Sequence, residues 1–209
     1  MTDFSALTLG GFLDAIASDT PTPGGGTAAA TAGAMGAALA AMVSALTLSK
    51  EKYAASHDAM RPIAEAARLA RKELLSLARE DSEAYDEVVG ARRMPKETDE
   101  QKTARSHRIA VANRRAAEVP METARAAVRL MGALPELAEK GNPNAASDVG
   151  AAALLLDACV EGALLNVGIN LSGIEDAGFV AEMQRETAVL QEQSQRLRSQ
   201  VVALVRKRF

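Results

Sequence analysis

The chain has 209 residues, of which 48% are hydrophobic and 24% charged, so it can bury a large core in one domain. Its net charge of -3 gives no general attraction for nucleic acid or an anionic membrane surface, so we do not expect a general polyanion-binding protein. The single cysteine, Cys159, has no disulfide partner, and neither it nor His57 and His107 shows metal-ligand spacing. We therefore expect a cytoplasmic protein without a bound metal.

The first predicted helix spans Thr8–Ala17, and it leads into the loop Pro21-Thr22-Pro23-Gly24-Gly25-Gly26-Thr27. The prolines end the helix, the glycines allow bare backbone N–H groups to approach a ligand, and Thr27 is predicted to cap the next helix. The loop resembles a phosphate cradle, but it follows a helix and lacks the Lys-Ser/Thr of a P-loop. A helix-entry turn is therefore favoured over a nucleotide site.

The second predicted helix spans Thr27–Ala55 and is uncharged as far as Leu48. This run is long enough to cross a bilayer, yet small residues dominate it, no aromatic belt flanks it, and acidic residues precede it. We therefore predict no membrane insertion. Small residues recur every fourth position, at Ala29, Gly33, Ala37 and Ala41, and are expected to let another helix come close in a bundle or a dimer interface.

After Lys50 every long segment has helical periodicity, and no segment shows the pattern of a strand. The further predicted helices are Met60–Ala91, Asp99–Gly132, Pro135–Lys140, Ser147–Ser172 and Ala177–Lys207. Short turns separate them, so we predict an all-α fold: a single-domain bundle of long antiparallel helices over residues 1–209. The last helix is expected to pack on the bundle rather than form a coiled coil with a partner, and the basic stretch Lys102–Arg115 to be a solvated face rather than a site for an anionic ligand tail.

Two groups of polar residues are candidates for chemistry. Asp81 and Tyr85 are four residues apart on one helix face and could meet the same ligand, although the acidic residues around Asp81 favour an ordinary charged surface. The turn from Asn142 to Asp148 crowds four polar side chains at a helix start, where capping explains one or two of them. The others could hold a general base or orient a water molecule.

Polar groups of the helix over Ser147–Ser172 face two ways. Asp148, Cys159, Gly162, Asn166 and Asn170 share one stripe, while Asp157 and Glu161 fall on the opposite side. In a straight helix Asp148 and Asn166 are about 27 Å apart, too far for both to contact one small reacting centre. Either the glycines bend the helix, or its ends serve different neighbours, which in a dimer could be different sites. Buried polar groups paired to helix termini are the purely structural alternative.

In order along nearly the whole chain, these segments resemble the cyclodeaminase and cyclohydrolase domain of the formiminotransferase-cyclodeaminase family. The matching pieces are Pro21–Gly26, Leu46-Thr47 with Lys50 and Tyr53, Asp81 with Ala84-Tyr85 and Val88, Pro95-Lys96, Val119-Pro120, Gly141-Asn142 with Asn144, Ser147-Asp148, and Glu161-Gly162-Ala163 through Asn166-Val167 to Asn170-Leu171. The resemblance implies a helical, homodimeric folate enzyme with its site near the subunit interface.

Two reactions are known for such domains: closure of 5-formiminotetrahydrofolate with loss of ammonia, and hydrolysis of 5,10-methenyltetrahydrofolate to 10-formyltetrahydrofolate. These residues contain no formiminotransferase half to supply a formimino substrate, so we expect the cyclohydrolase, with the cyclodeaminase as the alternative. A non-catalytic helical module that binds a partner is a second alternative, although a scaffold would not require the polar turn before Asp148.

The resemblance and the local chemistry together suggest roles for named residues. Asp81 is the first candidate for the base and Asp148 the second, while Tyr85 and Lys50 would orient water or stabilise developing oxygen charge. The folate, with one or more glutamates, would be held by Pro23, Gly24, Gly25, Gly26, Tyr53, Lys96, Asn142, Asn144, Ser147, Glu161 and Asn166. Lys96 would meet the glutamate tail. No metal and no cofactor are expected, because the methenyl carbon is already electrophilic.

Overall fold

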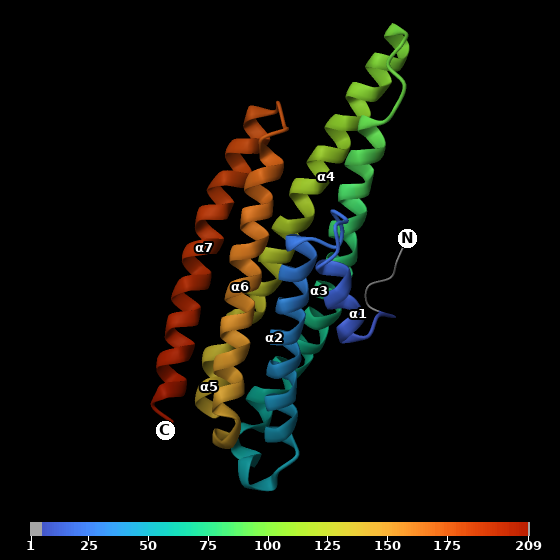
Figure 1. The fold of residues 1–209 in the computed structure, drawn as a ribbon. Helices are drawn as coiled ribbons and strands as arrows, with labels where there is room; N and C mark the ends of the chain where they lie inside the picture. Colours follow the sequence, from blue (N-terminus) through green and yellow to red (C-terminus); the bar gives the residue numbers. More distant parts are fainter. Residues whose placement is uncertain (1–5, 209) are drawn as a thin grey trace.

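The computed structural model describes residues 6–208, which form a bundle of long helices (Figure 1). The elements are α1 (Leu9–Ile16), α2 (Gly25–Leu48), the 3-10 helix η2 (Glu51–Ser56), α3 (His57–Arg92), α4 (Asp99–Met131), α5 (Leu134–Lys140), the 3-10 turn η3 (Pro143–Ala145), α6 (Ala146–Leu171) and α7 (Ala177–Arg206). Consecutive long helices run in opposite directions, and no strand occurs over the residues described. The predicted all-α antiparallel bundle is confirmed.

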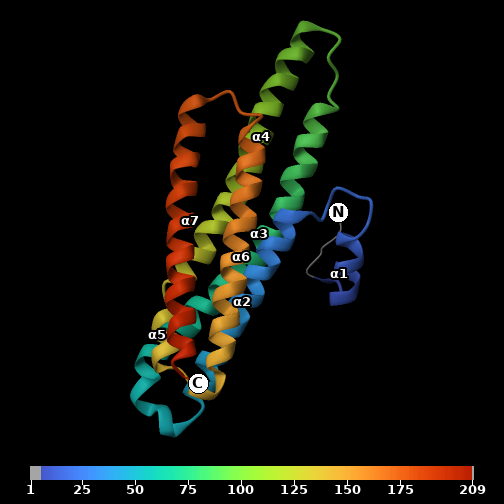
Figure 2. The ribbon, with the colours of Figure 1, turned by 60° about the vertical axis from the view of Figure 1, so that its left-hand side comes forward.

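The helices pack around an alanine-rich core. Helix α2 packs on α3 and α6, α4 packs on α3 and α6, and α7 covers α6 and α4. The larger buried side chains include Met60, Leu74, Met121, Met131 and Leu156. Both views show the α3–α4 end projecting beyond the rest of the bundle, and Figure 2 shows α1 standing off to one side. The long helices therefore place residues far apart in sequence at the same level of the bundle.

Most helix boundaries agree with the sequence predictions to within three residues, but the second helix differs. It ends at Leu48 instead of Ala55, because Lys50 adopts extended backbone angles (φ -120°, ψ 119°) and the chain continues as η2. The predicted capping role of Thr27 is wrong. The helix begins at Gly25 with Gly24 as its N-cap, so Thr27 lies in the first turn and its hydroxyl bonds elsewhere.

The expected close approach of another helix to the small residues of α2 is confirmed, and that helix is α6. A Cβ atom added to Gly33 would lie 2.6 Å from Cys159 Sγ, and one added to Gly36 would lie 2.9 Å from the Ala152 carbonyl oxygen. By length and composition alone, Gly25–Leu48 and Pro143–Leu171 could each cross a membrane, and 50% and 44% of their most apolar windows are buried in the bundle. Two strongly apolar helices thus keep a face outside the core.

The two-sided character predicted for α6 is also observed. Cys159 and Gly162 face α2, where a Cβ on Gly162 would lie 2.9 Å from the Ala29 side chain. On the other side, Asp157 accepts a hydrogen bond from Ser194 (2.7 Å) and pairs with Arg198 (3.1 Å between Oδ2 and Nε). Glu161 accepts from Gln191 Nε2 at 2.8 Å. Asp157 and Glu161 of α6 therefore bind α7.

Candidate functional site

A cavity of about 340 Å³ lies where the N-terminal end of α2 meets α3, α4 and the C-terminal end of α6. The glycine-rich loop forms one wall and α3 another. The lining residues include Pro21, Thr22, Gly24, Gly25, Gly26, Asp81, Tyr85, Val88, Arg92, Asn113, Ala116, Asn166, Ile169, Asn170 and Gly173. Six of the residues that the sequence singled out, Gly24, Gly25, Gly26, Asp81, Tyr85 and Asn166, therefore meet in one place.

Asp81 lies against the first turn of α2, and a glycine makes that contact possible. A Cβ on Gly26 would lie 2.6 Å from Asp81 Cγ and 2.7 Å from Oδ2, closer than real Cβ contacts. Thr27 Oγ1 donates a hydrogen bond to Asp81 Oδ2 at 3.0 Å, and the Ser82 hydroxyl lies 3.0 Å from Thr27 Oγ1. Because the Thr27 proton is directed at Asp81, Ser82 is the donor to Thr27. Two buried hydroxyls thus hold the carboxylate in one orientation.

Burial raises the pKa of the Asp81 carboxyl above its ordinary value, because desolvation disfavours the ionised form. Hydrogen bonds from the hydroxyl and the backbone of Thr27 oppose this effect and lower the pKa. The start of α2 adds the positive end of a helix dipole beside the carboxylate. Asp81 is therefore a partly desolvated carboxylate in a cavity, which is the environment of a general base.

Four residues of α3 line the cavity along one stripe: Asp81, Tyr85, Val88 and Arg92. Their spacing of three or four residues puts them on one face of the helix. Tyr85 is 41% exposed, so its phenol is available to a ligand. Asp81 and Arg92 are the two charged residues among those that line the cavity, and they stand at opposite ends of the stripe.

Three asparagines form the opposite wall. The Nδ2 groups of Asn113, Asn166 and Asn170 donate to the carbonyl oxygens of Gly173 (3.0 Å), Gly162 (2.9 Å) and Ala116 (2.7 Å). A carbonyl only accepts, so each amide is fixed in orientation and its Oδ1 remains to accept from a ligand. The sequence analysis missed Asn113 as a site residue. One sequence feature could have indicated it: Asn113 is an uncharged amide inside a basic stretch, and it lies three and four residues before the core residues Ala116 and Ala117, on the same helix face.

The polar turn Asn142–Asp148 and Tyr53 lie at the other end of α2. The Asn142 backbone N–H donates to Thr47 Oγ1 at 2.9 Å, and Asn142 Oδ1 accepts from the Tyr53 hydroxyl (2.9 Å) and the Asn144 N–H (3.1 Å). These bonds tie the end of α2 to η2 and the start of α6. The polar side chains of this turn that capping does not explain therefore have a structural role. Within one chain they do not reach the cavity.

The remaining predicted residues lie outside the cavity. Lys50 is exposed just after α2, and Ser147 and Asp148 lie in the first turn of α6, about 27 Å along that helix from Asn166. Glu161 faces α7, Pro23 is buried in the loop, and Lys96 is exposed in the α3–α4 connection. Within one chain, Asp81 lines the cavity and Asp148 does not.

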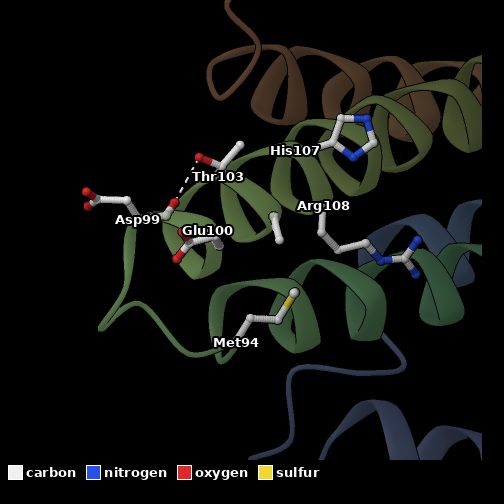
Figure 3. Close-up of a pocket in the computed structure, with 7 residues that line it drawn as sticks. Met94, Asp99, Glu100, Thr103, His107 and Arg108 are labelled. Atoms are coloured by element: carbon white, nitrogen blue, oxygen red, sulfur yellow. Dashed lines mark hydrogen bonds between the residues drawn. The ribbon is translucent and has the colours of Figure 1, made fainter.

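A larger hollow of about 960 Å³ lies at the projecting α3–α4 end (Figure 3). Two of its polar residues already serve the start of α4: Asp99 pairs with Lys102 at 2.8 Å, and the Thr103 hydroxyl donates to the Asp99 carbonyl at 2.9 Å. The hollow is shallow and open, so the smaller cavity around Asp81 is the better candidate. In residues 6–208 there is no group of three or more His, Cys, Asp or Glu side chains arranged to hold a metal ion.

Comparison with known proteins gives matches over most of the chain. The sequence profile of the Formiminotransferase-cyclodeaminase family matches residues 8–189. Methenyltetrahydrofolate cyclohydrolase of Methylorubrum extorquens is 42% identical over 175 residues, which is 84% of each chain. Formimidoyltransferase-cyclodeaminase of Gallus gallus is 34% identical over 96% of this chain, which spans 37% of that longer protein. The crystal structure of formiminotetrahydrofolate cyclodeaminase from Thermotoga maritima superposes with a TM-score of 0.87 at 34% identity, covering 97% of this chain and 98% of that one. The chain belongs to the formiminotransferase-cyclodeaminase family.

Proposed function

We propose that this protein hydrolyses 5,10-methenyltetrahydrofolate to 10-formyltetrahydrofolate. The observation that carries the proposal is the half-buried Asp81 carboxylate, held by Thr27 at the edge of a cavity with three oriented amides. The choice of this reaction is supported by the cyclohydrolase of Methylorubrum extorquens, which is 42% identical over 84% of both chains.

The reaction requires one activated water. Asp81 removes a proton from water as the oxygen attacks the methenyl carbon, giving a tetrahedral carbon bonded to N5, N10 and a hydroxyl group. The bond from this carbon to N5 then breaks, N5 takes up the proton held by Asp81, and the hydroxyl proton leaves to solvent as the formyl C=O forms on N10. The Tyr85 phenol is placed to donate to the developing oxygen charge. The amidinium carbon is electrophilic from the start, so the scheme requires no metal or cofactor.

The test is the absorbance decay of 5,10-methenyltetrahydrofolate with purified protein, corrected for spontaneous hydrolysis. We expect acceleration by the wild type and its loss in Asp81→Asn, while Asp86→Asn, an exposed carboxylate on the same helix, retains activity. No acceleration by the wild type would reject the cyclohydrolase. Acceleration that survives Asp81→Asn in a folded variant would move the base elsewhere.

Cyclodeamination of 5-formiminotetrahydrofolate is the second candidate, favoured by the likeness to the Thermotoga maritima cyclodeaminase over 97% of this chain. It also passes through a tetrahedral carbon between N5 and N10, so the same groups could serve it. Ammonia release from 5-formiminotetrahydrofolate, measured beside the hydrolysis assay, decides between the reactions.

We further propose that the protein is a homodimer joined through α2 and α6. The outer faces of these helices form an apolar surface that includes Met35 (52% exposed), Met42, Leu154, Leu165 (75%) and Ile169 (71%). Helix α2 carries no charge, and Asp157 and Glu161 of α6 face α7. An extended apolar face of this kind is typical of a subunit interface.

A two-fold contact with antiparallel α2 helices would place the far end of one subunit beside the cavity of the other. Lys50, Asn144, Ser147 and Asp148, which one chain holds away from Asp81, would then complete the site. Leu165→Glu should produce monomers in analytical ultracentrifugation, whereas Val189→Glu, with a 51% exposed side chain on α7, should not. Mixing inactive Asp81→Asn and Lys50→Ala subunits should restore part of the activity. A Leu165→Glu dimer would reject this interface.

A further inference from the structure

We infer that Arg92 is the binding site for a carboxylate of the glutamate in the folate substrate, an inference that rests on the proposed function. Arg92 lines the cavity in the last turn of α3, at the opposite end of the stripe from Asp81. Among residues 6–208 its guanidinium has no ion pair and no hydrogen bond, whereas Arg108 and Arg115 of α4 pair with Glu87 and Glu80 of α3. A cavity that presents a cation without a partner is suited to an anionic group of a ligand.

The spacing along α3 matches the length of the substrate. Eleven residues separate Asp81 from Arg92, a rise of about 16 Å along the helix. In folate the reacting carbon and the glutamate α-carboxylate are about 10 Å apart through the aminobenzoyl group, from standard bond lengths. The long Arg92 side chain covers the difference, and Val88 lies between the two charges to contact the aromatic ring.

The charges of the cavity also fix the direction in which the substrate binds. Asp81 repels the glutamate carboxylates and Arg92 attracts them, so the tail is directed toward the α3–α4 end and the reacting carbon toward Asp81. Arg105 adds positive charge at this end, since its guanidinium donates to the Arg92 carbonyl oxygen at 3.0 Å.

The dipole of α3 does not by itself account for this arginine. A cation in the last turn or at the end of a helix is favoured by the dipole, but Arg93, the C-cap residue, supplies one without lining the cavity. Arg93 is therefore a matched control, one position away with the same charge and an exposed side chain.

The experiment compares Arg92→Gln, Arg92→Lys and Arg93→Gln on two substrates, 5,10-methenyltetrahydrofolate and a pteroate analogue in which a neutral methylamide replaces the glutamate, so that no carboxylate remains. We expect Arg92→Gln to raise KM for the folate roughly tenfold, as for loss of a charged hydrogen bond in a partly exposed site, with kcat little changed. On the pteroate analogue Arg92→Gln should equal the wild type. Arg92→Lys should recover part of the loss, and Arg93→Gln should match the wild type on both substrates.

Equal losses on both substrates would overturn the inference, because Arg92 would then act on the fold or the reacting end. No loss on the folate would overturn it as well. Binding of 5-formyltetrahydrofolate and its pteroate methylamide analogue, measured by calorimetry, makes the same comparison without turnover. If the wild type binds folate with a preference for the glutamate that Arg92→Gln abolishes, the inference holds even where the proposed hydrolysis fails.

Discussion

Replacing Gly26 with alanine is expected to remove most of the activity and to leave the fold intact. The new Cβ would lie 2.6 Å from Asp81 Cγ and nearer still to Oδ1, whereas ordinary contacts begin at 3.4 Å, so the carboxyl group must retreat by at least about 0.8 Å. That movement takes Oδ2 away from the Thr27 hydroxyl, now 3.0 Å from it. A misplacement of about 1 Å in a catalytic group costs on the order of a hundredfold in rate, and we expect a fall of that size in kcat.

Two opposing effects on stability keep the variant folded. Alanine in a helix is favoured over glycine by about 1 kcal/mol. Loss of a hydrogen bond to the carboxylate costs about 1.5 to 3 kcal/mol. The melting temperature should therefore change by only a few degrees, while kcat falls steeply.

Gly90→Ala is the matched control, because a Cβ on Gly90 in α3 meets nothing within 4 Å. Gly90→Ala should be stabilised by the higher helix propensity of alanine and should keep full activity. The assay is methenyltetrahydrofolate hydrolysis beside thermal unfolding of the same samples. A Gly26→Ala enzyme with wild-type kcat would refute the reasoning, since the carboxylate could then be displaced without consequence.

Three further predictions concern buried polar groups. Thr27→Val removes a hydrogen-bond donor to the ionised carboxylate and so raises the pKa of Asp81 further. The acid limb of the pH profile of kcat/KM should therefore move to higher pH, and Thr27→Ser should restore its position. An acid limb that does not move in Thr27→Val would contradict the role of Thr27. Because the pKa of Asp81 is raised, the folded state holds this proton more tightly than the unfolded chain, and stability falls as pH rises above the ordinary value of 3.8. Asp81→Asn should therefore melt above the wild type at pH 7, with the advantage vanishing toward pH 3.8; equal melting temperatures at pH 7 would argue against a destabilising carboxylate. Burial raises the pKa of Cys159 to about 12, so a thiol reagent should label the native protein only as fast as it unfolds, and rapid labelling would show an open α2–α6 contact.

The helices and their order could be predicted from the sequence because the signals are local. Proline and glycine mark the turns around Pro95 and Gly141, and periodicity marks the long helices. The end of α2 could not be predicted, since Lys50 and the residues after it still favour a helix and only the extended angles of Lys50 break it. That geometry is set by packing: the Tyr53 hydroxyl reaches Asn142, a residue 89 positions later.

The candidate site was predicted in part. Asp81, Tyr85 and the glycine loop could be named from a resemblance, but Asn113 and Arg92 could not, since each stands among charged residues that read as solvated surface. Conversely, Asn142 and Asn144 have the polar character of a site and lie at the far end of α2. The sequence does not show how far along the bundle axis each residue lies, because that position depends on where each helix begins.

A capping role alone does not explain why Asp81 lies at the start of α2. A serine, threonine or asparagine in place of Gly24 would cap that helix locally, without burying a charge. Instead the N-cap is a glycine with no side-chain bond, and a carboxylate from α3, 54 residues after Thr27, takes the place beside the first turn. Its raised pKa means that the ionised form is held there at a cost in stability. Glycine at position 26 admits the carboxylate, the Thr27 and Ser82 hydroxyls orient it, and the cavity with its three amides lies beside it. A half-buried carboxylate held in this way beside a cavity is what the proposed hydrolysis requires of its base.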